Sequence, residues 1–330
     1  MSKKYKVVGI GNAIVDVLTQ CDDTFLDHMG IEKGIMQLVE KDRAETLYGA
    51  METRVQAPGG SVCNTLAALG ALGLDTALIG RVRDDALGRF YVEGTEAGGT
   101  AFVNPPVTDS DLPTSRSMIF VSPDGERSMN TYLGISADIS PADVSEAVAS
   151  DAEYIFLEGY LFDKPEGKAA FTAAAKACRS TGGKTGISLS DPFCVDRHRD
   201  DFRRLVKDEL DFVLGNEEEW CSLYEQENVV DALEMARKEC ELVVCTRSGD
   251  PVIAIRGDEK VEIPVERVTP VDATGAGDMF AAGFLYGLAT GQTLETCGKM
   301  GTTAAAECIR HIGPRPKNDM KTIFQSAGLI

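Results

Sequence analysis

The chain has 330 residues, of which 43% are hydrophobic and 26% charged, a composition typical of a globular protein. Its formal net charge of −19 argues against nucleic acid and anionic membranes as partners, because both require a basic face. No apolar run approaches the roughly 18 residues that span a membrane, and the N-terminus has no signal-peptide pattern. Nine cysteines without a Cys-x-x-Cys pair indicate thiols of a reducing compartment. We therefore expect a cytoplasmic protein.

The first third of the chain combines short strands with breaks. A strand is predicted over residues 5–10 and another over 76–80, and residues 34–57 have weak strand character. Pro58-Gly59-Gly60 predicts a break before a helix over 61–72. Residues 102–133 read as β-structure, with a hairpin turn at Pro123-Asp-Gly-Glu126.

From about residue 138 the chain alternates between strands and helices, which predicts a mainly parallel sheet covered by helices. The predicted strands are residues 154–157, 185–189, 212–214 and 242–246, and the predicted helices are residues 164–181, 217–225 and 231–239. The earlier β-rich pieces do not fit this rhythm, so parts of 14–57 and 100–133 are expected to form a small β-sheet lid. We expect one domain over residues 1–330.

The most informative segment is Asp272-Ala-Thr-Gly-Ala-Gly-Asp278, which opens a helix over residues 279–290. Small residues allow close approach of a ligand, and the first amides of a helix lack internal partners, so an anion such as phosphate fits there. A carboxylate beside such a site is repulsive unless it has a task, and accepting a proton from an attacking nucleophile is one. The simpler interpretation is a tight turn in which Asp278 serves only the helix dipole.

Gly9-Ile-Gly11 follows the first strand, but Ile14 stands where a dinucleotide fingerprint needs a third glycine, so that interpretation is rejected. On an extended segment Asn12 and Asp16 project from the same face. A carboxylate there can accept hydrogen bonds from two neighbouring hydroxyls, as on a ribose. Alternatively, Asp16 caps a turn.

Gly59 and Gly60 precede the predicted helix at residues 61–72 and form another candidate site with Asn64 of its first turn. Two glycines let the backbone approach a ligand, and the Asn64 amide offers a donor and an acceptor. The alternative is a loop in which Ser61 caps the helix.

Asn216-Glu-Glu-Glu219 follows the strand at 212–214 and resembles a capping box, which is the simpler interpretation. The functional interpretation is that Asn216 and Glu219 hold water and magnesium beside phosphates. The three histidines have no zinc-site spacing.

Together, the order and spacing of these motifs resemble the ribokinase-like (PfkB) carbohydrate and nucleoside kinases, from about residue 5 to 316. Within that family the chain is most similar to adenosine kinases, through Gly11 to Asp16, Ser188-Leu-Ser-Asp-Pro-Phe193, Gly215 to Glu219 and Cys308 to Gly313. The resemblance implies a three-layer α/β/α fold with a mainly parallel sheet and a small β-sheet lid. It also implies ATP and Mg²⁺ as cofactors and allows a homodimer that pairs through the lid.

Roles for individual residues follow from the same resemblance. Asp278 corresponds to the catalytic base of the family. The backbone of the three preceding residues, Gly275, Ala276 and Gly277, corresponds to the anion hole. Asn216 and Glu219 correspond to the magnesium and phosphate motif, with Glu219 acting on Mg²⁺ through water. Asp272 and Thr274 match positions that hold a monovalent cation, which suggests K⁺.

The acceptor and nucleotide sites are also implied by the resemblance. The acceptor-binding residues are Asn12, Asp16, Gly59, Gly60, Asn64 and Tyr160. Thr246, Arg247 and Gly249 lie where the family binds ATP, although this loop lacks the usual pair of spaced glycines, which leaves the nucleotide preference open.

The activity implied is transfer of the γ-phosphoryl group of ATP to the 5′-hydroxyl of a nucleoside, with adenosine favoured. The alternative is a sugar kinase acting on ribose, fructose or a related ketose. A non-catalytic sensor is a third reading, and the carboxylate of Asp278 argues against it, because a pure binder gains nothing from a negative charge beside phosphate.

Overall fold

The computed structural model describes residues 3–330. Its larger sheet has nine strands in the order β14-β13-β12-β11-β10-β9-β1-β5-β6. The strands from β12 to β6 are parallel, and β13 and β14 are added antiparallel at one edge. In chain order they are β1 (Tyr5–Ile10), β5 (Thr76–Ile79), β6 (Thr100–Phe102), β9 (Ala152–Glu158), β10 (Lys184–Ser188), β11 (Phe212–Asn216), β12 (Leu242–Arg247), β13 (Asp250–Arg256) and β14 (Glu259–Ile263).

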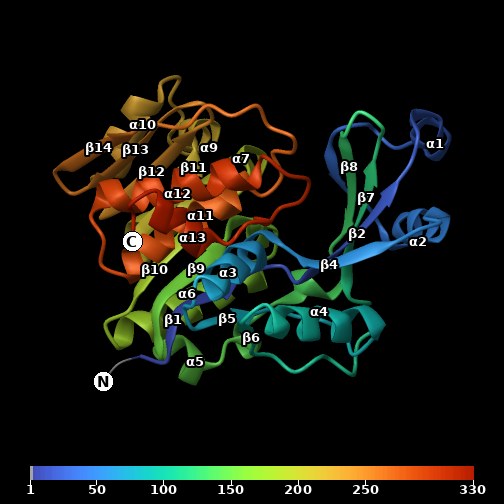
Figure 1. Ribbon diagram of the computed structural model, residues 1–330. Coiled ribbons are helices and arrows are strands. Elements are labelled where there is room, and N and C mark those ends of the chain that lie inside the picture. Colours follow the sequence, from blue (N-terminus) through green and yellow to red (C-terminus); the bar gives the residue numbers. More distant parts are fainter. Residues whose placement is uncertain (1–2) are drawn as a thin grey trace.

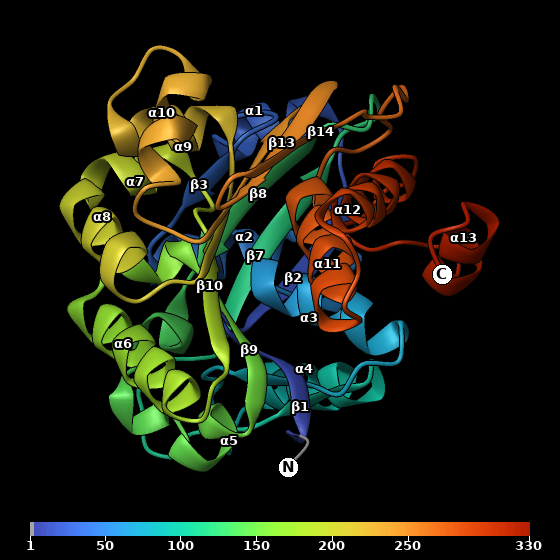
Figure 2. The same ribbon diagram turned by 90° about the vertical axis from the view of Figure 1, so that its left-hand side faces the viewer.

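Helices cover both faces of this sheet because its strands are apolar on both sides (Figures 1 and 2). Neighbouring residues of β1 enter different cores: Val7 packs with the first helix layer and Val8 with the second. The first layer contains α3 (Ser61–Ala71), α4 (Ala86–Ala97), α11 (Ala276–Ala289) and α12 (Leu294–Cys308), with α13 (Met320–Ser326) packed beside them. The second contains α5 (Glu146–Ser150), α6 (Pro165–Ser180), α7 (Pro192–Arg197), α8 (Arg199–Asp208), α9 (Glu217–Tyr224) and α10 (Val229–Ala236).

A smaller sheet projects from one side of this body (Figure 1). Its five strands follow the order β3-β8-β7-β2-β4 and are β2 (Ile14–Gln20), β3 (Met36–Leu38), β4 (Val55–Gly59), β7 (Ser115–Val121) and β8 (Arg127–Tyr132). Helices α1 (Asp23–Met29) and α2 (Lys41–Ala50) cover one face, where the rings of Phe25 and Phe120 lie 5.5 Å apart. Side chains of the other face, including Asp16 and Met129, line a cavity shared with the main body.

The predicted three-layer α/β/α fold, its mainly parallel sheet and its second, smaller sheet are confirmed. The predicted hairpin turn at residues 123–126 joins β7 to β8. No helix among residues 3–330 is long and apolar enough to cross a membrane.

The structure differs locally from two predictions, at residues 41–50 and at Pro58-Gly59. Residues 41–50 form helix α2, although the segment from 34 to 57 showed only strand character. Of the strands in residues 100–133, β7 and β8 lie in the smaller sheet, whereas β6 pairs with β5 in the larger one. Pro58 lies inside β4, which an edge strand tolerates because one side needs no ladder donor, and the chain turns only at Gly60.

Candidate active site

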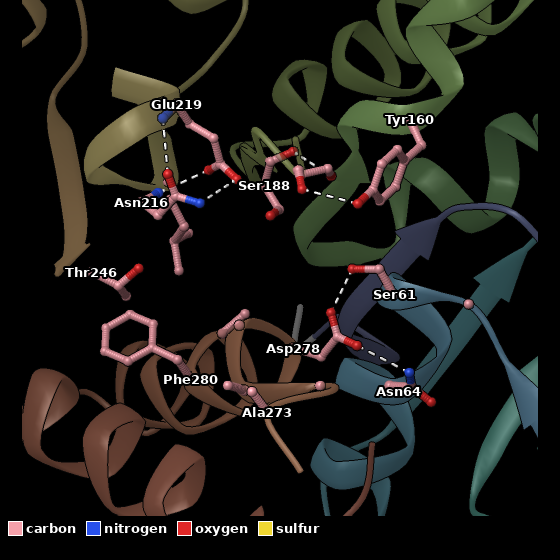
Figure 3. Close-up of a pocket in the computed structure, with 18 residues that line it drawn as sticks. Ser61, Asn64, Tyr160, Ser188, Asn216, Glu219, Thr246, Ala273, Asp278 and Phe280 are labelled. Carbon is pink, nitrogen blue, oxygen red and sulfur yellow. Dashed lines mark hydrogen bonds between the residues drawn. The ribbon is translucent and has the colours of Figure 1, made fainter. Parts of the chain in front are cut away.

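A cavity of about 380 Å³ lies at the carboxyl ends of the parallel strands, where ligands bind in open α/β sheets (Figure 3). Its walls come from the ends of β9 to β12 and from the starts of α3 and α11. The lining residues include Gly60, Ser61, Asn64, Tyr160, Ser188, Asn216, Glu219, Thr246, Gly275, Ala276, Gly277, Asp278 and Phe280.

The start of α11 provides free backbone amides to this cavity. The Ala276 N–H donates to Ala273 O at 3.2 Å, whereas the amides of Gly277 and Asp278 find no backbone acceptor among the residues that the structure describes. Gly275 has φ +80°, and a Cβ atom there would lie 2.5 Å from Pro314 O, so this position requires glycine. The start of α11 therefore presents free amides to the cavity, at the place where the sequence predicts an anion site.

Asp278 stands in the first turn of α11 and faces α3 (Figure 3). Its carboxylate accepts hydrogen bonds from Ser61 Oγ at 2.6 Å and from Asn64 Nδ2 at 3.0 Å. Burial raises the pKa of Asp278 to about 6, while these two hydrogen bonds and the charge of Arg315 act in the opposite direction. The group is therefore a base poised near neutral pH, which suits proton transfer.

Arg315 contributes to the site from the loop between α12 and α13, and sequence reasoning missed it. Its Nε donates to Asn64 Oδ1 at 3.1 Å and its Nη2 to Pro58 O at 2.6 Å. Asn64 thus accepts from Arg315 through its side-chain oxygen and donates to Asp278 through its nitrogen, so it holds the Asp278 carboxylate in place. No periodic pattern marks this arginine, because its partners lie about 250 positions earlier in the chain.

A second cavity, of about 410 Å³, opens between the smaller sheet and the main body and shares Gly60, Ser61 and Tyr160 with the first. Its other lining residues include Asn12, Asp16, Met36, Leu38, Met129, Glu158, Asp163, Asp191, Phe193 and Arg197. The two cavities are therefore neighbours and meet at the three shared residues.

The Asp16 carboxylate lies against the backbone of Gly59: a Cβ atom on Gly59 would come within 2.4 Å of Asp16 Oδ2. Within the described part of the chain, this carboxylate accepts no hydrogen bond, so its oxygens are free for a ligand. Burial raises the pKa of Asp16 to about 7, opposed by the charges of Arg315 and Arg127. Gly60 has φ +97° and its Cβ would lie 2.2 Å from Asn12 O, which explains the second glycine.

Glu158, at the end of β9, is a buried carboxylate that sequence reasoning missed. It accepts hydrogen bonds from the Asn12 backbone at 3.3 Å, from Asn12 Nδ2 at 2.8 Å and from the Val62 N–H at 3.1 Å. Because α3 has no side-chain cap of its own, Glu158 caps it from a distant strand. Asn12 also accepts a hydrogen bond from Ser136 Oγ at 2.9 Å, so its amide is held in place at the cavity wall.

Asn216 and Glu219 form the capping box that was the simpler interpretation, and both also line the first cavity. Glu219 accepts from the Asn216 backbone at 2.8 Å and from Asn216 Nδ2 at 2.9 Å, and burial raises the pKa of Glu219 to about 7. Each oxygen keeps a lone pair, so this carboxylate can hold a water of hydrated Mg²⁺. No group of three or more His, Cys, Asp and Glu side chains that could hold a metal ion occurs among residues 3–330.

The predicted nucleotide loop is only partly at the cavity. Thr246, at the end of β12, lines it, whereas Arg247 and Gly249 do not. Arg247 instead pairs with Glu217 at 3.3 Å. Asp272 and Thr274, predicted to hold a cation, precede α11, and Asp272 forms a buried ion pair with Arg127.

Comparisons with known proteins agree with this geometry. Residues 31–321 match the model of the pfkB family carbohydrate kinases. The crystal structure of adenosine kinase from Sinorhizobium meliloti is 44% identical, with a TM-score of 0.89 over 98% of this chain and 99% of that one. A probable sugar kinase from Rhizobium etli CFN 42 is 40% identical, with a TM-score of 0.91 over 99% and 100%. A fructokinase from Klebsiella pneumoniae is 28% identical over 76% of this chain and 87% of its own length.

The protein therefore belongs to the PfkB family of carbohydrate kinases, and it is an ATP-dependent kinase. Its relatives include both an adenosine kinase and a fructokinase, so the family alone leaves the acceptor open.

Proposed function

We propose that the protein transfers the γ-phosphoryl group of ATP to the 5′-hydroxyl of a nucleoside, and that adenosine is the preferred acceptor. The first cavity would hold the ATP phosphates and the second the nucleoside. Transfer would occur where the two cavities meet, at Gly60, Ser61 and Tyr160.

In this mechanism the Asp278 carboxylate accepts the proton of the attacking hydroxyl. The free amides of the α11 start stabilise the charge that develops on the transferred phosphoryl group. Ser61 and Asn64 hold the base in place through the hydrogen bonds that they donate to it. Magnesium bound with ATP would neutralise phosphate charge, and Glu219 and Asn216 are placed to hold its water.

On the acceptor side, Asp16 would bind the ribose hydroxyls, since its oxygens line the second cavity and lack protein donors among residues 3–330. Asn12 and the backbone of Gly60 would complete this wall. Closure of the smaller sheet over the acceptor, as a lid, would exclude water from the reaction.

The observation that favours a nucleoside over a free sugar is the apolar surface of the second cavity. Phe193 is 73% exposed there, and Met36 and Leu38 of the smaller sheet are 42% and 54% exposed. A flat nucleobase would cover these side chains, and stacking on an aromatic ring contributes about 1–3 kcal/mol per base. A free ribose or fructose would leave them in water.

The test is an ADP-release assay with adenosine, ribose and fructose as acceptors, in the wild type and in Phe193→Ala. We expect kcat/KM for adenosine to exceed that for either sugar by at least about a hundredfold. Phe193→Ala should raise the KM for adenosine and leave any ribose activity unchanged. More efficient turnover of fructose or ribose would replace the nucleoside proposal with the sugar-kinase alternative.

We also propose a cytoplasmic location, which all nine cysteines as free thiols support.

Helices α1 and α2 cover the outer face of the smaller sheet, so a homodimer that pairs through this sheet would use its strand edges.

A further inference from the structure

The loop before α11 contains a buried ion pair that spans the two sheets. Arg127, at the start of β8 in the smaller sheet, places Nε 3.0 Å from Asp272 Oδ2, and both side chains are 6% exposed. The sequence had suggested that Asp272 and Thr274 hold a monovalent cation. In the structure, a guanidinium group stands at that carboxylate.

We infer that Arg127 replaces the monovalent cation in this protein, so that the phosphate-binding loop is ordered by the smaller sheet and not by K⁺. The inference rests on the proposed role of the α11 start in binding phosphate.

Two backbone amides also contact the Asp272 carboxylate. Its Oδ1 accepts from the Thr274 N–H at 3.0 Å and its Oδ2 from the Gly313 N–H at 2.8 Å. A carboxylate has about four lone-pair sites, and these two amides use one on each oxygen, while the Arg127 guanidinium lies 3.0 Å from Oδ2 as an ion pair. A K⁺ ion at this carboxylate would lie beside a buried guanidinium and be repelled by it.

These contacts reach the anion-binding helix directly. Gly313 is followed by Pro314, which packs on Gly275 at the start of α11. The next residue, Arg315, donates to Asn64, which in turn donates to the proposed base. Asp272 therefore ties the loop before α11 to the loop after α12, and Arg127 ties both to β8. A bound ion would order the loop by itself, whereas Arg127 can do so only while the smaller sheet is in place.

Arg127 belongs to the same five-stranded sheet as the acceptor carboxylate Asp16, and its charge opposes the effect of burial, which raises the pKa of Asp16. One guanidinium group thus influences the acceptor side and the phosphate side of the site. The resulting coupling would assemble the anion site when the smaller sheet covers the acceptor.

The test compares the wild type with Arg127→Met and Arg127→Lys in K⁺ and in tetramethylammonium at equal ionic strength. The readouts are kcat, the KM for ATP and the melting temperature without substrates. The wild type should show the same values in both salts. Arg127→Met should lose about ten- to a hundredfold in kcat, because the loop is misplaced, and K⁺ should partly restore kcat and raise the melting temperature. Arg127→Lys should fall between the two.

Arg116→Met is the matched control, because Arg116 is a buried arginine of the same sheet. Its guanidinium carbon lies 4.7 Å from the ring centre of Tyr48 in α2, on the face of the sheet that α1 and α2 cover. This control variant should gain no response to K⁺. Activation of the wild type by K⁺ together with a higher melting temperature would overturn the inference. So would an Arg127→Met protein that loses activity but responds to K⁺ in neither readout. If no acceptor is phosphorylated at all, the proposed function fails, while the melting comparison still decides this inference.

Discussion

Replacing Asp278 with asparagine removes the proposed base while preserving its surroundings. The aspartate accepts from Ser61 Oγ and Asn64 Nδ2. In the variant the amide oxygen can still accept from Asn64, and the amide nitrogen can donate to the Ser61 oxygen, because a hydroxyl can also accept. The variant should therefore fold and bind ATP as the wild type does.

The expected loss is in turnover. A general base contributes about two to four orders of magnitude to kcat, which corresponds to about 2.7–5.4 kcal/mol in activation free energy. The base works only as a carboxylate, so wild-type kcat at saturating substrates should fall as the pH drops below about 6. The acid limb that belongs to Asp278 should be absent in the variant.

The variant Ser61→Ala tests whether the acid limb of the pH–rate profile belongs to Asp278. The Ser61 hydroxyl donates only to Asp278 and lowers its pKa, so losing it should move the acid limb to higher pH. A hydrogen bond to a charged group contributes about 1.5–3 kcal/mol, and water replaces part of it, so the limb should move by about one pH unit. The plateau rate should stay within a few-fold.

The assay is steady-state ADP release over a pH series, with ATP affinity measured separately by calorimetry. Turnover of Asp278→Asn within a few-fold of wild type would remove this carboxylate from the mechanism. A limb that moves to lower pH in Ser61→Ala would show that another group controls it.

Three further outcomes can be measured. Asp16→Ala should raise the KM for the acceptor about ten- to a hundredfold and leave the KM for ATP unchanged, since about 1.5–3 kcal/mol of hydrogen bonding is lost on one side only; an equal rise in both would refute the assignment. Glu158→Gln leaves the Val62 N–H facing an amide donor, so above pH 7, where Glu158 is ionised, the free energy of unfolding should fall by about 1–3 kcal/mol in urea titrations. Unchanged stability at that pH would contradict the capping role. Burial raises the pKa of Glu158 and Glu219 from 4.5 to about 7, so between these pH values the folded state binds more protons than the unfolded state. The melting temperature should therefore fall as the pH rises through this range, and a constant melting temperature would argue against burial as the cause.

The helix start at Gly275 to Asp278 could be predicted from sequence because its physics is local. Free amides, glycine conformations and the carboxylate all lie within a few consecutive residues, and tertiary packing only had to expose them. The three-layer fold was predictable for a similar reason, since alternating strand and helix patterns restrict the chain to few architectures. The error at residues 41–50 arose because α2 is mostly polar and buries only Ala44 and Leu47, so its apolar periodicity is weak.

The tertiary structure alone decided how the site is held together. Arg315 reaches Asn64 across 251 positions, and Glu158 reaches Asn12 across 146, distances at which no periodicity links two residues. The same holds for Arg127, whose pairing with Asp272 needs a strand of one sheet to meet a loop of the other. Sequence determined which residues could bind an anion and accept a proton, because those properties belong to short segments. Which charges surround them depends on long-range packing, because a lone arginine or glutamate carries no local signal of the partner that it meets after folding.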